Sequence, residues 1–481
     1  MGGRASAGDR THRIPLRQGR PVTTAEGPAS ESGFVTPAAS AYRGATVKLL
    51  LLAAAMFMVG TNASIIAGLL PEIAHGLKAT QSTVSYSITV YSVVVAIVAP
   101  VASIVLVRMP RAVLMSIGAV FFSAGTLVAS LSTSATGFVG GRAIAALGGA
   151  ALVPTAGAVA ATLVPPERRG RALALVSLGF TLSSVLGAPI GTALGSLASW
   201  RLPMLCLAGL GIIVGIGIGI FLRGVPTPPV TPLRHRLAPL ADRRVLGGIG
   251  TTLFIVVAFN VVFIFSASLT ADATGGSGVL LAALLMTNGL AGIVGNFFAG
   301  RFTDRFGSRY VAVIALSVII VLLAVMPLAL GSLVACLVVF LIWGLVSAGT
   351  SVPVQYRLIA IDPDDAVVTL SWNSTAMYVG IALSPPLGNL AIGIGGVHLT
   401  PVVGAVCAAL ALCSFLIGTL PVRERGRRRR PEATRQVAKA ARTARRAESD
   451  SLASNAIASN ATGSNPTAQG LTAPTTAGCE H

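Results

Sequence analysis

The sequence predicts an all-α membrane protein with twelve spanning helices in two pseudo-symmetric halves of six. Three observations lead to this fold class. The 481 residues are 53% hydrophobic and only 11% charged, which is too apolar for an ordinary soluble domain. The apolar residues gather in runs that are each near the roughly 20 residues a spanning helix needs. The pattern of the first six runs is then repeated in the remaining six.

Hydrocarbon offers the backbone no hydrogen-bond partners, so runs of this length cross it as helices. The first half is expected to contain helices at about 46–69, 83–107, 112–131, 137–163, 172–197 and 203–222. The second half is expected to contain helices at about 245–270, 278–300, 310–330, 332–353, 366–391 and 399–420.

The segments outside these runs set the expected domain boundaries. Residues 1–45 and 421–481 are polar or basic and biased in composition, which is typical of disordered tails. We expect one six-helix half at 46–222, a linker at 223–244 and a second half at 245–420.

The net charge of +19 lies in tails and short loops, with no aromatic-rich soluble domain beside it, and this argues against nucleic-acid binding. If the amino terminus is cytosolic, nearly all loop arginines fall on the cytosolic side, whereas the outer loops hold Lys78 and Arg201. We therefore expect a multi-pass protein of the cell membrane, surrounded by lipid, with both termini in the cytosol.

The cysteines predict neither a disulfide nor a metal site. Four of the five lie inside apolar runs, and none has a metal-ligand spacing. Phosphate-binding, zinc-protease and serine-elbow motifs are also absent from the sequence. We expect no cofactor, no metal and no enzymatic activity.

An internal repeat supports the division into halves. A shift of about 198 residues aligns Asn62 with Asn260 and Pro189 with Pro386. The alignment is weak in overall identity, so these aligned prolines and asparagines carry most of its weight.

The most informative stretch is 137–200. It holds one cation in an apolar run, Arg142, then the charged hinge VPPERRGRA at 164–172, then GAPIGTALG at 187–195. Pro189 removes a helical hydrogen-bond donor and is expected to bend the helix. The small residues around Pro189 let a neighbouring helix come close, and these are Gly187, Gly191 and Gly195. Such a broken helix is typical of a cavity wall.

This stretch resembles the fourth and fifth helices of the major facilitator superfamily, most closely its drug:proton antiporters and sugar exporters of the arabinose-efflux type. The resemblance implies a transporter that exports small drug-like molecules or sugars by alternating access in exchange for protons. GAPIGTALG then corresponds to the antiporter motif. We expect a monomer that binds a small-molecule substrate.

Two loops resemble the gating loops of that superfamily. In GRFTDRFGSR at 300–309, the matching residues are Asp304, Arg305, Gly307 and Arg309. Gly307 is expected to permit a tight turn. The equivalent first-half loop, VRMPR at 107–111, has Arg108 and Arg111 but Val107 in place of the acid.

The loop charges are complementary between the halves. The architecture implies that Arg108 and Arg111 face Asp364 and Asp365, and that Asp304 faces Arg168 and Arg169. These pairs predict a cytosolic latch that holds the outward-open state. The alternative is that the charges only solvate loop ends, because exposed pairs contribute about 0–1 kcal/mol each.

Arg142 is expected in the outer half of the fourth helix, where a cation is costly and needs a partner. The resemblance implies a role in proton or substrate coupling. The alternative is that Arg142 caps the carbonyls that the bend at Pro189 leaves free.

Carboxylates are missing from the interior of the predicted helices. Every Asp and Glu falls in a tail, a loop or a helix end. Proton coupling needs a titrating group that is exposed to each side in turn, and Glu72 and His75, both peripheral, are the nearest candidates.

Polar side chains inside apolar runs either pair across helices or face a cavity. The set comprises Asn62, Tyr86, Tyr91, Asn260, Asn288, Asn296, Gln355, Tyr356, Trp372, Asn373 and Tyr378. As substrate ligands we favour Asn62, Asn260, Gln355 and Asn373, together with Arg142. The neutral amides indicate an uncharged or amphipathic substrate. An importer or uniporter on the same fold, and a membrane-embedded sensor or enzyme, are the alternatives.

Overall fold

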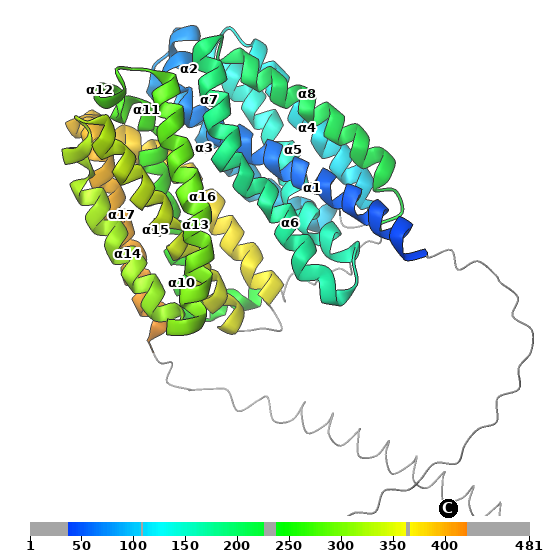
Figure 1. Ribbon diagram of the computed structural model, residues 1–481. Helices are drawn as coiled ribbons and strands as arrows, with labels where there is room; N and C mark the ends of the chain where they lie inside the picture. Colours follow the sequence, from blue (N-terminus) through cyan, green and yellow to red (C-terminus); the bar gives the residue numbers. More distant parts are fainter. Residues whose placement is uncertain (1–36, 107–108, 226–236, 362–365, 421–481) are drawn as a thin grey trace, which may run out of the picture. The chain divides into compact units, whose positions relative to one another are not determined.

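The computed structural model describes residues 37–106, 109–225, 237–361 and 366–420. This part of the chain is helical and contains no strand. Twelve of its helices are long and apolar enough to cross a membrane, which confirms the predicted fold class (Figure 1).

The first half contains six spanning elements joined by short connections. Their bounds are α1 (Pro37–Gly68), α3 (Gln81–Val105), α4 (Arg111–Leu131), α5 (Ala135–Thr162), α6 (Arg169–Leu182) continued by η2 (Ser183–Gly187) and α7 (Ala188–Leu197), and α8 (Arg201–Phe221). Two short pieces, α2 (Leu70–Gly76) and η1 (Pro166–Arg168), connect them. The helix α1 begins inside the segment that we expected to be a disordered tail, because Pro37 suits a first helical position and the next residues tolerate a helix.

The second half repeats this plan. Its spanning elements are α10 (Arg243–Ile264), α13 (Gly278–Phe306), α14 (Ser308–Val325) with η4 (Met326–Ala329), α15 (Leu333–Ile361), α16 (Ala366–Gly395), and η5 (Val397–Leu399) with α17 (Thr400–Thr419). Three short pieces lie before α10 or between α10 and α13: η3 (Ala238–Ala241), α11 (Ser266–Leu269) and α12 (Ala271–Thr274).

The motif GRFTDRFGSR lies mostly on a helix, although the sequence suggested a loop. The helix α13 continues through it to Phe306 and ends where Gly307 adopts φ +85°. Arg, Phe, Thr and Asp can all extend a helix, so the helix stops only at a residue that tolerates positive φ. The sharp turn expected at Gly307 is present.

Side chains cap several helix starts. The hydroxyls of Thr80 and Ser134 accept hydrogen bonds from backbone N–H groups at the starts of α3 and α5. The Asp242 carboxylate does the same for α10, and the Ser277 hydroxyl for α13. These residues satisfy N–H groups that have no partner within the helix, and they fix where each span begins.

The internal repeat is visible in helix packing. In the first half, Gly191 of α7 faces the side chain of Ile65 on α1. In the second half, its aligned partner Gly388 of α16 faces the side chain of Phe265, which directly follows α10. Aligned glycines therefore bring the fifth helix of each half against the first.

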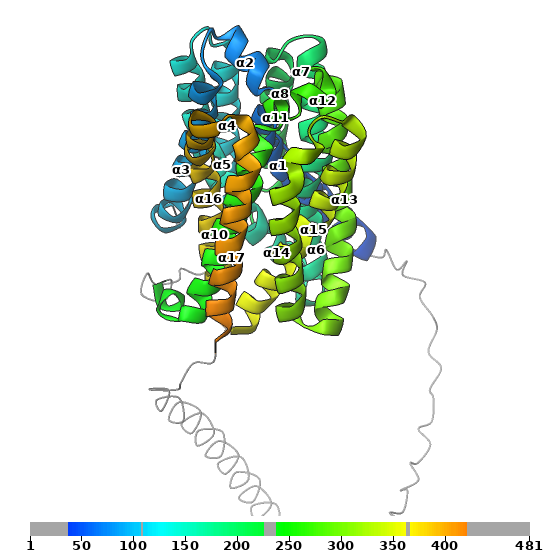
Figure 2. The ribbon, with the colours of Figure 1, turned by 90° about the vertical axis from the view of Figure 1, so that its left-hand side faces the viewer.

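Both halves belong to one compact unit, Met1–Gly418; of the remaining segment, Thr419–His481, the structure describes only the first two residues. Figures 1 and 2 both show α2, α11 and α12 together at the same end of the helices, toward the top of each view. We call this the α2 end, and we call the end that carries Gly307 the Gly307 end.

Candidate functional site

A polar cluster lies inside the first half, around Arg142 of α5. Its side chain is fully buried, with 0% exposure. The guanidinium Nη1 donates to the backbone carbonyl of Asn62 at 2.8 Å and also to the Asn62 side-chain carbonyl. The Asn62 amide nitrogen donates in turn to the Thr126 hydroxyl of α4 at 2.9 Å. Arg142 therefore joins α1, α4 and α5 through neutral partners.

The other side of the guanidinium lies against an aromatic ring. The Arg142 guanidinium carbon is 4.6 Å from the ring centroid of Tyr91 on α3, which is a favourable cation–π distance. Arg142 Nε and Nη2 and the Tyr91 hydroxyl have no hydrogen-bond partner among the described residues. Three polar atoms of this buried cluster are thus left without a partner.

The contacts of Arg142 decide against one of our two interpretations. We considered that Arg142 caps carbonyls near Pro189, but its hydrogen bonds go to Asn62 on α1. Just before Pro189, the helix contains η2, a π-helical turn at Ser183–Gly187. Such turns relax a helix where a residue cannot donate its normal hydrogen bond.

The symmetry-related amide in the second half has a different environment. Asn260 on α10 donates to the Val256 carbonyl of its own helix at 2.9 Å. Nearby in sequence on α10, the Thr252 hydroxyl donates to the Asn373 side-chain carbonyl of α16 at 2.6 Å. The favoured amides therefore divide into Asn62 with Arg142 in one half, and Asn260 and Asn373 in the other.

The remaining favoured ligand, Gln355, is exposed on α15 and takes no part in the hydrogen bonds described above. Asn288, from the wider set, donates to the Phe340 carbonyl at 3.1 Å and links α13 to α15. This is the packing role that we expected for part of that set.

The small residues of GAPIGTALG pack against α1. Gly187, Gly191 and Gly195 face the side chains of Thr61, Ile65 and Leu69, respectively. Both series advance by four residues, which matches ridges that interdigitate between two helices. On η2, Val185 approaches the second half, where its Cα lies 2.7 Å from the position that a Cβ on Gly289 of α13 would take.

Side-chain hydrogen bonds join the two halves near the α2 end. The Ser268 hydroxyl pairs with the Gln81 side-chain carbonyl at 2.6 Å, and Asn389 Nδ2 donates to the Ser85 hydroxyl at 3.0 Å. Further along α3, the Thr89 hydroxyl donates to the Ala382 carbonyl at 2.9 Å. Tyr91 then packs with Tyr378 of α16 in a cluster that both halves share. The halves are thus in direct contact from the α2 end down to the Arg142 cluster.

The two proton-coupling candidates differ in their surroundings. Glu72 on α2 is half-buried, and its Oε2 has no hydrogen-bond partner among the described residues. A Cβ on Gly278, the first residue of α13, would stand 3.7 Å from Glu72 Oε1. Burial raises the pKa of the Glu72 carboxyl, an effect partly offset by a hydrogen bond with the backbone of the same residue. His75 is exposed.

The predicted gating residues at the Gly307 end are only partly described. Arg108, Asp364 and Asp365 lie outside the described residues. Arg111 is buried, with 9% exposure, which differs from the expected loop position because it starts the helix α4. The exposed members are Arg168, Arg169, Asp304, Arg305, Gly307 and Arg309.

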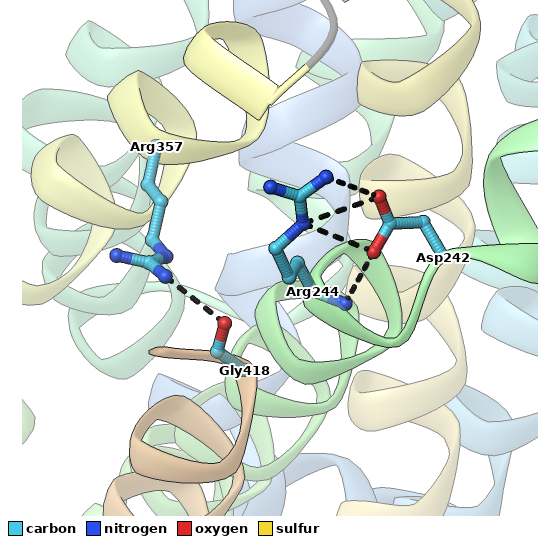
Figure 3. Close-up of polar contacts among 4 residues, drawn as sticks. All are labelled: Asp242, Arg244, Arg357 and Gly418. Carbon is cyan, nitrogen blue, oxygen red and sulfur yellow. Dashed lines mark hydrogen bonds and ion pairs between the residues drawn. The ribbon is translucent and has the colours of Figure 1, made fainter. Parts of the chain in front are cut away.

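A different set of charges is paired at this end (Figure 3). Arg244 and Asp242 form an ion pair at 2.9 Å, at the start of α10. Arg357 of α15 donates to the Gly418 carbonyl at 2.9 Å, near the end of α17. These contacts lie within the second half, so they stabilise that half and do not join it to the first.

Sequence reasoning missed Thr126 and the pair Gln81 and Ser268. Thr126 belongs to a stripe of buried hydroxyls on α4 that also contains Ser123 and Ser130. The stripe has helical spacing, so the sequence pattern alone could have indicated a polar face on this helix. Gln81 and Ser268 carry no such signal, because their pairing depends on how the halves meet.

A helical membrane protein of two repeated halves, with polar side chains buried inside each half and hydrogen bonds between the halves, has the architecture of a secondary transporter. The family model of the Major Facilitator Superfamily matches residues 52–367. The chain belongs to the major facilitator superfamily and is a membrane transporter.

Curated relatives and solved structures agree with this family. The chain is 29% identical over 372 residues to an uncharacterized MFS-type transporter, YbcL, of Bacillus subtilis, covering 77% of this chain and 95% of that protein. It is 27% identical over 365 residues to the inner membrane transport protein YdhP of Escherichia coli, covering 76% and 94%.

Among solved structures, a bacterial homolog of the human lysosomal transporter Spinster, in an inward-facing and unoccupied conformation, matches with a TM-score of 0.65. It is 16% identical and covers 78% of this chain and 97% of the other. At this identity the likeness concerns the fold.

Proposed function

We propose that this transporter exports small drug-like molecules or sugars by alternating access of its two halves. The observation that carries the proposal is the location of the contacts between halves, which run from the α2 end to the Arg142 cluster. In alternating access, one end of the seam closes while the other admits the substrate. This structure then corresponds to a state that is closed at the α2 end.

The orientation of the protein in the membrane determines which side the closed α2 end faces. The arginine-rich loops favour a cytosolic Gly307 end and cytosolic termini in the cell membrane, so the α2 end faces outward. An exporter takes up substrate in a state closed on the outside, and an importer releases substrate in the same state, so this state is compatible with export but does not fix the direction. The support for export is the resemblance of GAPIGTALG to the antiporter motif.

Proton exchange is the second part of the proposal, with Glu72 and His75 as its candidates. Glu72 supports it because its environment depends on whether the halves meet at the α2 end. The position of Glu72 is peripheral, so a proton bound there must also find a route to the cytosolic side.

Transport by purified protein in liposomes tests the proposal. We expect saturable movement of at least one member of a panel containing a neutral sugar, the cation ethidium and the anion benzoate. Cells that express the protein should accumulate less of that compound than control cells. Greater accumulation would favour the importer or uniporter, and absence of movement for every compound would contradict the proposal for this substrate range.

The cytosolic latch is a separate proposal. Alternating access needs contacts at the Gly307 end in the opposite state, and complementary charges on Arg108, Arg111, Asp364 and Asp365 supply them. Reversing both arginines to Glu should impair transport, and reversing both aspartates to Arg in the same protein should restore it. Without rescue, the latch does not operate through these charges.

A further inference from the structure

The Arg142 cluster contains a buried positive charge that has no negative partner among the described residues. Its hydrogen bonds go to the Asn62 side chain and backbone, and its ring contact is with Tyr91, all of which are neutral groups. A guanidinium stays protonated in proteins, so the charge persists. Within the part of the chain that the structure describes, every carboxylate lies in a short connecting helix or at a helix end.

An unpaired charge in a buried site is strongly unfavourable, and buried charges are normally paired with an opposite charge or a metal. Asn62 uses one edge of the guanidinium, at Nη1. Nε and Nη2, on another edge, have no partner among the described residues, and neither has the Tyr91 hydroxyl. Two adjacent N–H groups of an arginine match the two oxygens of a carboxylate.

Tyr91, the aromatic neighbour of Arg142, packs in turn against the other half. Tyr91 lies over the guanidinium and packs with Tyr378 of α16 in the shared cluster, where their exposures are 2% and 9%. Because Tyr378 belongs to the second half, separation of the halves along α3 and α16 removes it from Tyr91. Arg142 has 0% exposure in the present state, and separation of the halves would uncover Tyr91, the ring that lies against its guanidinium.

We propose that Arg142, through Nε and Nη2 and with the Tyr91 hydroxyl beside it, binds the carboxylate of the transported molecule. The inference rests on the proposed transport function and narrows its substrate class to amphipathic monocarboxylates. Tyr378 shields the site in the state closed at the α2 end. The neutral amides of the second half then meet the uncharged remainder of the substrate.

Binding of benzoate and benzamide to the full-length protein in lipid nanodiscs tests this inference. The two probes have nearly the same shape and differ in charge. Chloride, added as sodium chloride, is the control for binding of any small anion. We expect benzoate to raise the Tm in a saturable manner. The half-saturating concentrations of benzamide and chloride should be at least about tenfold higher than that of benzoate. Equal effects of benzoate and benzamide would overturn the proposal, as would chloride acting as well as benzoate.

Four variants assign the effect to the site. Arg142→Gln should abolish the benzoate effect, and Arg142→Lys should weaken it by about tenfold because an ammonium loses the fork geometry. Arg201→Gln is the matched control: it removes an arginine whose side chain donates to the Ser132 carbonyl and lies over Trp200, away from Arg142. Tyr378→Ala should strengthen benzoate binding, because it removes the side chain that packs with Tyr91. Unchanged benzoate binding in Arg142→Lys and Tyr378→Ala would overturn the proposal even if Arg142→Gln fails to fold.

Failure of the carboxylate site and failure of the transport proposal give different results. If a neutral compound crosses liposomes equally well with wild-type protein and with Arg142→Gln, the transport proposal stands and the carboxylate site is wrong. If benzoate binding depends on Arg142 but no compound is transported, the site stands and the transport proposal fails.

Discussion

At the scale of single residues, Arg142 and Asn62 form the central polar contact of the first half. A buried guanidinium tolerates its environment only while its hydrogen bonds remain, because loss of one partner leaves a charged group unsatisfied. Within the described residues, the side chain of Asn260, the aligned residue of the second half, bonds to its own helix. The two amides therefore differ in importance although the repeat relates them.

This difference predicts unequal costs of substitution. Asn62→Leu should destabilise the purified protein by about 2–3 kcal/mol, because Arg142 loses the side-chain carbonyl of Asn62 and keeps only the backbone carbonyl of residue 62 as an acceptor. Asn260→Leu, the matched control, should cost less than about 1 kcal/mol. Thermal unfolding in detergent measures both.

A double variant tests whether Asn62 stabilises the protein through Arg142. Asn62→Leu combined with Arg142→Met should be more stable than Asn62→Leu alone, since the charge and its missing partner disappear together. If the double variant is the least stable of the series, Asn62 does not act through Arg142.

We expect Glu72 to make closure of the α2 end depend on pH. Burial at the closed α2 end raises the pKa of its carboxyl, so the protonated form is favoured when the halves meet there. Stabilisation of the closed α2 end is therefore present at acidic pH and is lost as the pH rises through the raised pKa of the closed state. Spin labels on α2 and α12 should report shorter distances as the external pH falls.

Substitution isolates the Glu72 effect. Glu72→Gln should give a short distance between the labels at every pH tested, because a neutral amide mimics the protonated acid. His75→Asn should leave the dependence unchanged, since His75 is exposed on the same short helix. An unaltered pH response in Glu72→Gln would show that another group titrates.

At the scale of elements, the fifth helix of the first half is held by glycines that face α1. Gly179 of α6 meets the backbone carbonyl of Ala53, and the glycines of η2 and α7 continue the same series. A backbone carbonyl cannot move aside as a flexible side chain can, so this contact fixes the distance between α1 and α6. The antiporter-like motif thus has a packing role that is independent of coupling.

The Gly179 contact predicts a large effect of one added methyl group. Gly179→Ala should destabilise the protein by about 1–3 kcal/mol, the usual cost of overpacking. Gly209→Ala on α8, where no atom lies within 4 Å of the added Cβ, should be neutral or stabilising by up to about 1 kcal/mol. Thermal unfolding of the two single variants measures the difference, and equal Tm values would contradict the packing described for α1 and α6.

At the scale of the whole molecule, composition and periodicity were sufficient for the fold. The span of hydrocarbon sets helix length, and the repeat aligns Asn62 with Asn260 and Pro189 with Pro386, so twelve helices in two halves followed from the sequence. The partners of Arg142 did not follow, because they depend on which helix faces stand opposite one another. The sequence likewise identified the small residues of GAPIGTALG but not α1 as their neighbour.

The contacts between halves were the least predictable part. Gln81 and Ser268 are ordinary polar residues at helix ends, and their hydrogen bond exists only because the halves close at the α2 end. Such contacts depend on how the two halves pack together and leave no periodic pattern in the chain. The extension of α13 to Gly307 was also unexpected, because polar residues near a membrane surface suggest a loop even when they favour a helix.

Alternating access requires the two halves to separate at the α2 end during transport. In a protein whose native cysteines are replaced, Gln81→Cys and Ser268→Cys place thiols on opposite halves, whereas Gly250→Cys and Ser414→Cys place them within the second half, where the Ser414 side chain lies beside Gly250. A short methanethiosulfonate cross-linker is applied to each pair in liposomes, and flux of a transported compound is measured before and after reduction. We expect cross-linking of the first pair to stop transport reversibly and that of the second pair to leave it intact. Full transport by protein cross-linked between residues 81 and 268 would contradict the account.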